Sequence, residues 1–367
     1  MSALLLPDDG RFGSGPSKVR PAQLAAISGS QLMGTSHRKS GVRDVVASIQ
    51  WGLRELFHLP QGYEVILGNG GASALWDAIS FCLVEDRAQA AVIGEFSGKA
   101  ARAVERAPWL SAPDVRRVEP GQMVECEPAD VDTYLYAHNE TSTGATTPLR
   151  RVAPDTGALT VVDATSIAGG IVFYPADVDF YYFSPQKCFG SDGGLWLALA
   201  SPAALERIER LTAERWVPDF LNLRLAVTNS RKAQTLNTPA IATLLMLEEQ
   251  VHWMLDLGGL ATMEARSRAS SDAVYEWAEA RPFATPFIAP AYRSPVVCTI
   301  DFADGAGVDG AAVAARLREF GVLDVEPYRS LGRNQLRIAT FPAIEVEDVR
   351  RLLGLIDEII GQGEHRR

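Results

Sequence analysis

Hydrophobic residues are arranged in two ways along the chain. From Val42 to Phe57, apolar side chains recur every three or four residues, which predicts an amphipathic helix. Runs such as Leu159–Val162 and Phe180–Phe183 are instead almost wholly apolar or aromatic, which predicts short buried strands. Further strands are predicted at Glu64–Leu67, Ala90–Ile93, Tyr134–Ala137 and Leu195–Ala200, and further helices at Ala72–Val84, at Ser97–Arg106 and from Pro202. Short apolar strands separated by helices favour an α/β fold whose largely parallel sheet is covered on both faces.

The order of predicted helices and strands changes after Gly258-Gly259. A long helix is predicted from Thr238 to Trp253 before this point, and another helix runs to about Arg281 after it. The later elements are predicted as a strand at Val296–Phe302, a helix at Asp309–Phe320, a strand at Gln335–Ala339 and a helix at Val346–Ile360. We therefore expect an N-terminal arm at 1–15, a large domain at 16–257 and a smaller α+β C-terminal domain at 258–367.

The composition of the 367-residue chain is that of a folded protein, with 47% hydrophobic and 22% charged residues. Its 35 basic and 45 acidic residues leave a net charge of −10. This balance argues against a nucleic-acid surface, because phosphate binding along a strand needs concentrated Lys and Arg. A local anion site stays compatible with it, since net charge says little about one pocket.

Cysteine spacing and the absence of long apolar segments indicate the compartment. The four cysteines form neither a CxxC pair nor a zinc-type pattern, so we expect free thiols; they are Cys82, Cys126, Cys188 and Cys298. No cluster of His, Asp and Glu argues for a metal. The N-terminus lacks a signal-peptide pattern, and no segment has 18 consecutive apolar residues. We therefore expect a cytoplasmic protein without a membrane span or a metal site.

A lysine in a glycine-rich turn gives the first indication of chemistry. Lys187 follows the predicted strand Phe180–Phe183 in the segment Ser184–Gly190, and Gly193 and Gly194 come shortly after it. Open α/β sheets bind ligands at the carboxyl ends of their strands. A lysine that loses its solvation there can also lose its proton and form a Schiff base. A solvated surface side chain is the alternative for any lysine taken alone.

Two further segments fit a phosphate-bearing cofactor. Asp163 ends another predicted strand, and a carboxylate paired with such a lysine suggests pyridoxal phosphate, whose pyridine nitrogen it would keep protonated. In isolation, Asp163 could simply cap a turn. The turn Gly68–Gly71 precedes the predicted helix that begins with Ala72 and Ser73, and N–H groups at a helix N-terminus can hold a phosphate. Taken alone, this turn fits a chain reversal equally well.

Together these residues resemble the fold type I pyridoxal-phosphate enzymes, and among them the phosphoserine aminotransferase family of class V. The similar segments span nearly the whole chain; they are Phe12–Pro16, Ser36–Arg38, Asn139–Thr141, Asp163, Gln186-Lys187, Asn237–Pro239 and Leu336–Ala339. The Ser-His-Arg and Asn-Glu-Thr elements are the more specific ones, and the segment from Tyr328 to Pro342 is similar to the actinobacterial branch. The resemblance implies a large domain with a mostly parallel seven-stranded sheet, a smaller C-terminal domain and a homodimer with shared active sites.

The resemblance also implies pyridoxal 5′-phosphate as the cofactor and gives the matching positions their roles. Lys187 would bind the aldehyde and act in catalysis, and Asp163 would pair with the pyridine nitrogen. Thr141 would make a polar contact to the ring. Phe96 would stack on the ring, at a position where many relatives have a tryptophan.

The cofactor phosphate would be held by residues from both subunits. Ala72, Ser73 and Gln186 would bind it from the same chain, and Asn237 and Thr238 would complete its site from the neighbouring one. Many relatives have Gly-Arg where this chain has Ala72-Ser73. The backbone donors are kept by this change, whereas the arginine side chain is lost.

The implied substrates carry two anionic groups, which arginine side chains bind well because the guanidinium fork matches carboxylates and phosphates. Arg337 matches the arginine that binds the α-carboxylate. His37 and Arg38 match the group that binds the distal anion, contributed across the dimer interface. Relatives carry a further His-Arg pair, for which Arg329 or Arg333 could substitute, and we favour Arg329.

The implied activity is reversible transamination between L-glutamate and 3-phosphohydroxypyruvate, giving 2-oxoglutarate and O-phospho-L-serine in serine biosynthesis. Some relatives also use a phosphorylated threonine-like intermediate of pyridoxine biosynthesis, and the sequence leaves this second use open. The alternatives are another class V aminotransferase, such as an alanine–glyoxylate aminotransferase, and a non-catalytic binding protein of the same fold. His37-Arg38 argues against the first, because glyoxylate has no distal anion, and intact Lys187 and Asp163 argue against the second.

Overall fold

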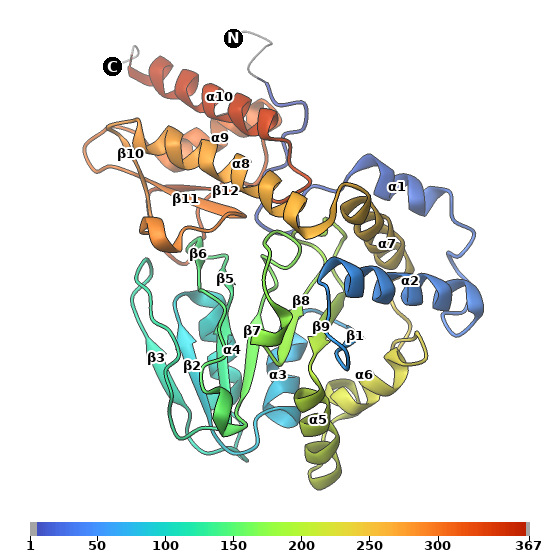
Figure 1. The fold of residues 1–367 in the computed structure, drawn as a ribbon. Coiled ribbons are helices and arrows are strands. Elements are labelled where there is room, and N and C mark those ends of the chain that lie inside the picture. The colour runs from blue at the N-terminus through green and yellow to red at the C-terminus, as the bar shows by residue number, and fades with distance from the viewer. Residues whose placement is uncertain (1–5, 365–367) are drawn as a thin grey trace.

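The computed structural model describes residues 6–364, which form a large β-sheet, a small three-stranded sheet and a two-stranded ribbon of β5 Asn139–Glu140 and β6 Ala145–Thr146 (Figure 1). The large sheet has seven strands in the order β1-β9-β8-β7-β4-β2-β3. Their bounds are β1 Glu64–Asn69, β2 Ala88–Val92, β3 Asp114–Arg117, β4 Thr133–Ala137, β7 Leu159–Asp163, β8 Phe180–Phe183 and β9 Leu195–Ala200. Only β9 runs against its neighbours, so the mostly parallel seven-stranded sheet is confirmed. The loops that follow the other six strands therefore lie at one edge of the sheet.

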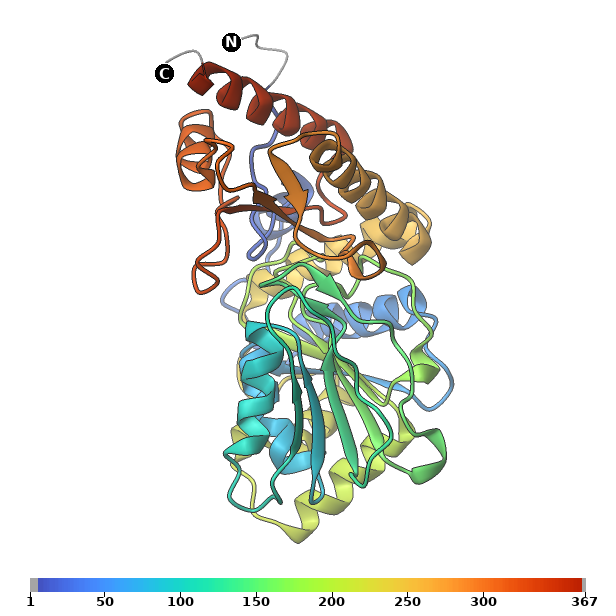
Figure 2. The same ribbon diagram turned by 90° about the vertical axis from the view of Figure 1, so that its left-hand side faces the viewer.

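Alternate residues of each strand face opposite sides of this sheet, and helices cover both sides (Figure 2). In β9, Leu195 and Leu197 join one hydrophobic core, whereas Trp196 and Ala198 join the other. The helices on the first side are α1 Pro21–Ser28, α2 Ser40–Leu56 and α7 Ile241–Asp256, and those on the second are α3 Ala72–Cys82, α4 Glu95–Glu105, α5 Pro202–Glu214 and α6 Leu223–Ser230. The strands are apolar on both faces because both faces are buried.

The small sheet is antiparallel and lies beside three helices, at the top of Figure 1. Its strands are β10 Ala284–Pro286, β11 Val297–Phe302 and β12 Gln335–Ala339, and the helices are α8 Gly259–Glu279, α9 Gly310–Glu319 and α10 Val346–Glu364. The Phe12 carbonyl accepts a hydrogen bond of 3.0 Å from the Ala339 N–H of this sheet, and the Ser17 N–H donates one of 2.9 Å to Gln186 beside the large sheet. The N-terminal segment thus ties the two sheets together. The domain bounds at 15 and 257 stay a prediction.

Several elements, among them α1, α6 and β10, are not predicted from the sequence pattern. Two other differences have a clear local reason. The strand β3 is not predicted, because Asp114, Arg116 and Arg117 leave no apolar run; it forms at the sheet edge, where charged side chains reach water. The helix α7 begins at Ile241 rather than at Thr238. Pro239 explains the later start, since the residue before a proline favours extended backbone.

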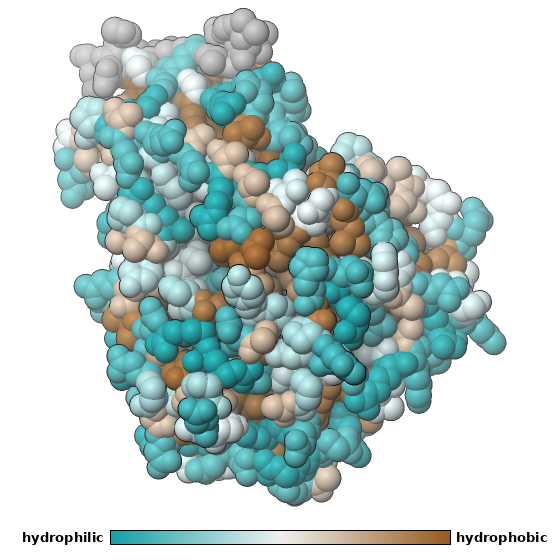
Figure 3. All heavy atoms as spheres, viewed as in Figure 1, coloured by the Kyte–Doolittle hydropathy of each residue, from teal (hydrophilic) through white to brown (hydrophobic). Residues whose placement is uncertain are grey.

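The surface shown in Figure 3 is mostly hydrophilic, with apolar patches near its middle. No helix within residues 6–364 is both long and apolar enough to cross a membrane. Within the same residues, no group of three or more His, Cys, Asp and Glu side chains is placed to hold a metal ion.

Candidate active site

The loops after the parallel strands enclose a pocket with an empty volume of about 1010 Å³. Asp163 ends β7, and Lys187 follows β8. The strand β4 continues into the short strand β5 (Asn139–Glu140), which leads directly to Thr141. Seven residues predicted to contact the cofactor line this pocket: Ala72, Ser73, Phe96, Thr141, Asp163, Gln186 and Lys187. The structure thus brings together in one chain all of those seven positions.

Lys187 is buried, and its side chain lies under the N-terminal segment. Its Nζ atom donates a hydrogen bond of 2.5 Å to the carbonyl oxygen of Ser14. A Cβ atom on Gly15 would lie 2.2 Å from Nζ, so a glycine is needed where the segment crosses the lysine. Burial, and then the positive charge of Arg337, lower the pKa of Lys187 from 10.5 to about 8. The neutral amine, which is the form that attacks an aldehyde, is therefore well populated in mildly alkaline solution.

The carboxylate of Asp163 is fixed by two donors. Its Oδ2 accepts a hydrogen bond of 3.0 Å from the indole N–H of Trp76, and its Oδ1 accepts one of 2.9 Å from the Thr165 N–H. Each oxygen keeps a lone pair that can accept from a ring N–H. The sequence reasoning misses Trp76, which lines the same pocket from α3. Its place one turn after Ala72 is the signal that could have found it.

The donor set of the pocket fits pyridoxal phosphate. Thr165 Oγ1 and Gln186 Oε1 are buried and have no hydrogen-bond partner among the described residues, although both residues line the pocket. Buried polar groups are normally paired, so these atoms indicate a polar ligand. Lys187 suits an aldehyde and Phe96 a ring face. The first turn of α3 suits a phosphate, and in this structure its Ala72 N–H donates a hydrogen bond of 3.0 Å to Ser184 Oγ.

Arg337 brings a positive charge from the small sheet toward this pocket. Its Nη1 donates a hydrogen bond of 3.2 Å to the Thr141 carbonyl oxygen, and its guanidinium lies 5.3 Å from the ring centre of Tyr328. Its Nε is buried without a partner in the described part of the chain. Burial lowers the pKa of Arg337. The unpaired N–H group leaves Arg337 ready to bind a carboxylate.

Comparison with known proteins decides the family. The family model for aminotransferase class V matches residues 22–323. Phosphoserine aminotransferase from Corynebacterium glutamicum (strain R) is 54% identical over 363 residues, which cover 98% of this chain and 96% of the relative. Phosphoserine aminotransferase from Rhodococcus opacus (strain B4) is 53% identical, again over 363 residues, covering 98% and 97%. The chain belongs to the phosphoserine aminotransferase family of class V.

A solved structure confirms the fold expected of a class V aminotransferase. The pyridoxal-phosphate-bound phosphoserine aminotransferase from Trichomonas vaginalis superposes with a TM-score of 0.82 at 22% identity, covering 95% of this chain and 99% of that one. An alanine–glyoxylate aminotransferase from Nostoc sp. superposes almost as well, with a TM-score of 0.80 at 22% identity, covering 98% and 97%. The fold is therefore shared by aminotransferases with different names, and the substrate must be argued from the site.

Six predicted residues of this class V aminotransferase do not line the pocket of their own chain. Two of them are Arg329 and Arg337, and the other four are His37, Arg38, Asn237 and Thr238. These four lie on two neighbouring segments, because the Arg38 guanidinium donates hydrogen bonds to Gln234 and to the Leu236 carbonyl oxygen. Asn69, which directly precedes the turn before α3, donates one of 3.0 Å to the Thr238 carbonyl oxygen. The Nε2 atom of His37 is buried and unpartnered within residues 6–364.

The structure separates the two arginines considered for the distal anion. Arg333 forms an ion pair with Asp301 at 2.6 Å, and its guanidinium lies 4.5 Å from the ring centre of Phe287. Arg329 is exposed and makes neither a hydrogen bond nor an ion pair with any residue between 6 and 364. Of the two, Arg329 therefore has the uncommitted charge.

Proposed function

We propose that this chain transfers an amino group reversibly between L-glutamate and 3-phosphohydroxypyruvate, with pyridoxal 5′-phosphate as cofactor. The products are 2-oxoglutarate and O-phospho-L-serine. The observation that carries the proposal is that Lys187, Asp163 and Thr141 line one pocket, while Arg337 donates a hydrogen bond of 3.2 Å to the Thr141 carbonyl oxygen. A lysine suits an aldehyde, an aspartate suits a ring nitrogen, and an arginine suits the α-carboxylate of an amino acid. The family membership supports the same reaction.

When bound, pyridoxal phosphate supplies an aldehyde that joins to the substrate amino group and a ring that stabilises negative charge at the substrate α-carbon. Asp163 holds a proton on the ring nitrogen, and the Trp76 N–H keeps the carboxylate in place. Thr141 and Phe96 contact the ring. Ala72, Ser73 and Gln186 bind the phosphate, together with Asn237 and Thr238 of a second subunit.

Lys187 moves the proton at the substrate α-carbon. Its pKa of about 8 allows the neutral amine to remove this proton and the resulting ammonium to give it back. The Ser14 carbonyl oxygen accepts a hydrogen bond from the same nitrogen and restrains its position. The two keto acids react in separate halves of the cycle, so we expect ping-pong kinetics.

The substrate anions are bound from both domains and from two subunits. Arg337 binds the α-carboxylate, which its buried and unpaired Nε supports. Arg329 binds the distal carboxylate or phosphate, together with His37 and Arg38 of a second subunit. The buried and unpaired Nε2 of His37 supports this assignment.

A homodimer is part of the proposal. Trp216 and Phe220 leave 79% and 51% of their surface exposed, which is unusual for large apolar side chains unless a partner covers them. A Cβ atom on Gly70 would lie 3.7 Å from the Phe220 ring, so this exposed ring adjoins the turn that begins the phosphate site. A second copy docked there would lie next to both pockets. We place the enzyme in the cytoplasm.

A substrate panel tests the function. With L-glutamate as donor, we expect 2-oxoglutarate to form quickly with 3-phosphohydroxypyruvate and slowly with glyoxylate. A phosphorylated threonine-like substrate in the same panel decides the second use in pyridoxine biosynthesis. Faster reaction with glyoxylate would identify an alanine–glyoxylate type of enzyme instead. No change in the cofactor's visible absorbance when glutamate is added would identify a non-catalytic binding protein.

A further inference from the structure

The carboxylate of Glu140 is buried between two segments that build the active site. Glu140 has no exposed surface and does not line the pocket. It stands between Asn139 and Thr141 in the Asn-Glu-Thr element, of which Thr141 is proposed to contact the cofactor ring. Burying a carboxylate is costly unless donors surround it, so its partners reveal what it holds.

All partners of this carboxylate are donors. Oε1 accepts hydrogen bonds from the Phe96 N–H at 3.2 Å and from the Ser142 hydroxyl at 2.6 Å. Oε2 accepts from the Ser97 N–H at 2.9 Å and from the Ser97 hydroxyl at 2.8 Å. Ser142 adds its own N–H to Oε1 at 3.2 Å. The carboxylate therefore binds the first turn of α4, whose N–H groups have no partner within the helix.

This first turn of α4 carries Phe96, whose ring lines the pocket. The ring centre lies 6.0 Å from Lys187 Nζ, and the ring packs against Tyr328 at 5.6 Å. Gly94 leaves room for the carboxylate, since a Cβ atom there would lie 2.4 Å from Glu140 Cγ. The backbone of Phe96 is thus fixed to the residue next to Thr141, and both residues are proposed to contact the cofactor ring.

We propose that Glu140 is a positioning residue, which sets the Phe96 ring against the cofactor ring by anchoring the start of α4. The proposal deepens the proposed function at the same site. It requires a carboxylate and not merely a side chain of that shape. In Glu140→Gln, an NH₂ group replaces one oxygen and would face N–H or O–H donors on either side, leaving a buried donor unpaired.

The test measures binding of pyridoxal phosphate to the cofactor-free protein. We expect Glu140→Gln to weaken binding about tenfold and to reduce the visible circular dichroism per bound cofactor. Glu95→Gln is the matched control, because the same isosteric change is made one residue before Phe96 at a partly exposed carboxylate paired with Lys99. This control should bind the cofactor as the parent protein does.

A double-mutant cycle with Phe96→Ala separates positioning from general loss of stability. If Glu140 acts through the Phe96 ring, Glu140→Gln should weaken binding in the parent protein and have little further effect in Phe96→Ala. Equal effects in both backgrounds, or parent-like affinity and circular dichroism in Glu140→Gln, would overturn the proposal.

Ser142→Ala is the variant to use if Glu140→Gln does not fold. It removes one hydrogen-bond donor to the Glu140 carboxylate and does not place two donors against each other. It should weaken binding by about two- to fivefold with the same dependence on Phe96, and parent-like binding would count against the proposal. A different preferred substrate would defeat the proposed function and leave these binding results unchanged.

Discussion

Two hollows lie at opposite edges of the large sheet, and charged side chains line both. The carboxyl edge holds the proposed active site. The amino edge holds a hollow with an empty volume of about 1310 Å³, beside the starts of β2, β4 and β7. Thr165 and Gln186 leave buried polar atoms unpaired in the first, whereas none of the residues that line the second, all of them described, does so. Unpaired polar groups, rather than size or charge, thus distinguish the edge that is proposed to bind the cofactor.

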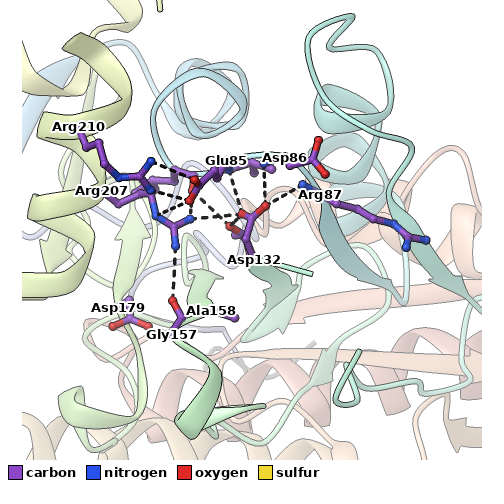
Figure 4. A network of polar contacts seen from close by, with 12 residues as sticks. Glu85, Asp86, Arg87, Asp132, Gly157, Ala158, Asp179, Arg207 and Arg210 are labelled. Carbon is purple, nitrogen blue, oxygen red and sulfur yellow. Dashed lines mark hydrogen bonds and ion pairs between the residues drawn. The ribbon is translucent and has the colours of Figure 1, made fainter. Parts of the chain in front are cut away.

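The polar groups at the amino edge of the sheet form hydrogen bonds with one another. The carboxylate of Asp132 accepts hydrogen bonds of 2.7 to 2.9 Å from the N–H groups of three successive residues, Glu85, Asp86 and Arg87. Arg207 donates to Asp132 at 3.3 Å (Figure 4). It also donates to the Leu83 carbonyl oxygen at 3.1 Å. These contacts join α5 to the starts of two strands, so this edge serves the stability of the fold.

The largest effect is expected from Lys187→Ala. Loss of the amine removes both the attachment point for the cofactor and the base at the α-carbon, so turnover should fall by about 10³-fold or more. Turnover of glutamate with 3-phosphohydroxypyruvate measures this. Mass analysis after borohydride reduction should find the cofactor on the Lys187 peptide in the parent protein only. Retained turnover would place the chemistry elsewhere.

Asp163→Asn and Asp132→Asn make the same change at the two edges. Asp163→Asn should lower kcat by roughly 10²-fold, because an amide cannot hold the charge opposite the ring nitrogen. Asp132→Asn should leave kcat unchanged and lower the free energy of unfolding by about 1–3 kcal/mol, since one of its N–H partners would face an NH₂ group. Steady-state kinetics measures kcat, and urea unfolding measures the free energy of unfolding. A kcat defect in Asp132→Asn would erase the distinction between the edges.

The pKa of Lys187 predicts a pH dependence at the carboxyl edge. A pKa lowered from 10.5 to about 8 means that the neutral amine is the minor form below pH 8 and the major form above it. Attachment of pyridoxal phosphate to the cofactor-free protein should quicken by about tenfold per pH unit up to about pH 8 and then level off. Arg337→Leu should move this midpoint upward, since the positive charge of Arg337 contributes to the lowered pKa. A midpoint near 10.5 would contradict burial as the main cause.

The sheet could be predicted from the sequence, as could seven candidate residues that the structure brings to one pocket, and the reasons are local. Buried parallel strands are continuous apolar runs; Asp163 ends one such run, and Lys187 lies four residues after the end of another. The contacts of Lys187 with Ser14 and of Asp163 with Trp76 could not be predicted, because they join segments far apart in the chain. Strand β3 was not predicted because its charged residues are typical of a strand at the edge of a sheet and not of a buried strand.

Arg329→Ala and Arg333→Ala test which arginine serves the distal anion. Arg333 is committed to Asp301, whereas Arg329 has no ion pair among the described residues. Arg329→Ala should therefore raise KM for 3-phosphohydroxypyruvate by about tenfold, the value of a hydrogen bond to a charged group. Arg333→Ala should change it less than about twofold. The reverse order would assign the contact to Arg333.

Arg207→Ala and Arg210→Ala compare two arginines of the amino edge, where no effect on catalysis is expected. The Arg207 side chain is 11% exposed and bonds to Asp132 and to backbone carbonyls, so its loss should lower the free energy of unfolding by about 1–3 kcal/mol. Arg210 is 40% exposed and pairs with Glu85, whose pKa it lowers chiefly through their hydrogen bond; Arg210→Ala should cost less than about 1 kcal/mol. Urea unfolding ranks the two, and kcat/KM should stay at the parent value in both. A loss of kcat/KM in Arg207→Ala, at a temperature where the protein stays folded, would contradict this expectation. It would mean that the hydrogen bonds of Arg207 and Asp132 affect catalysis across the sheet.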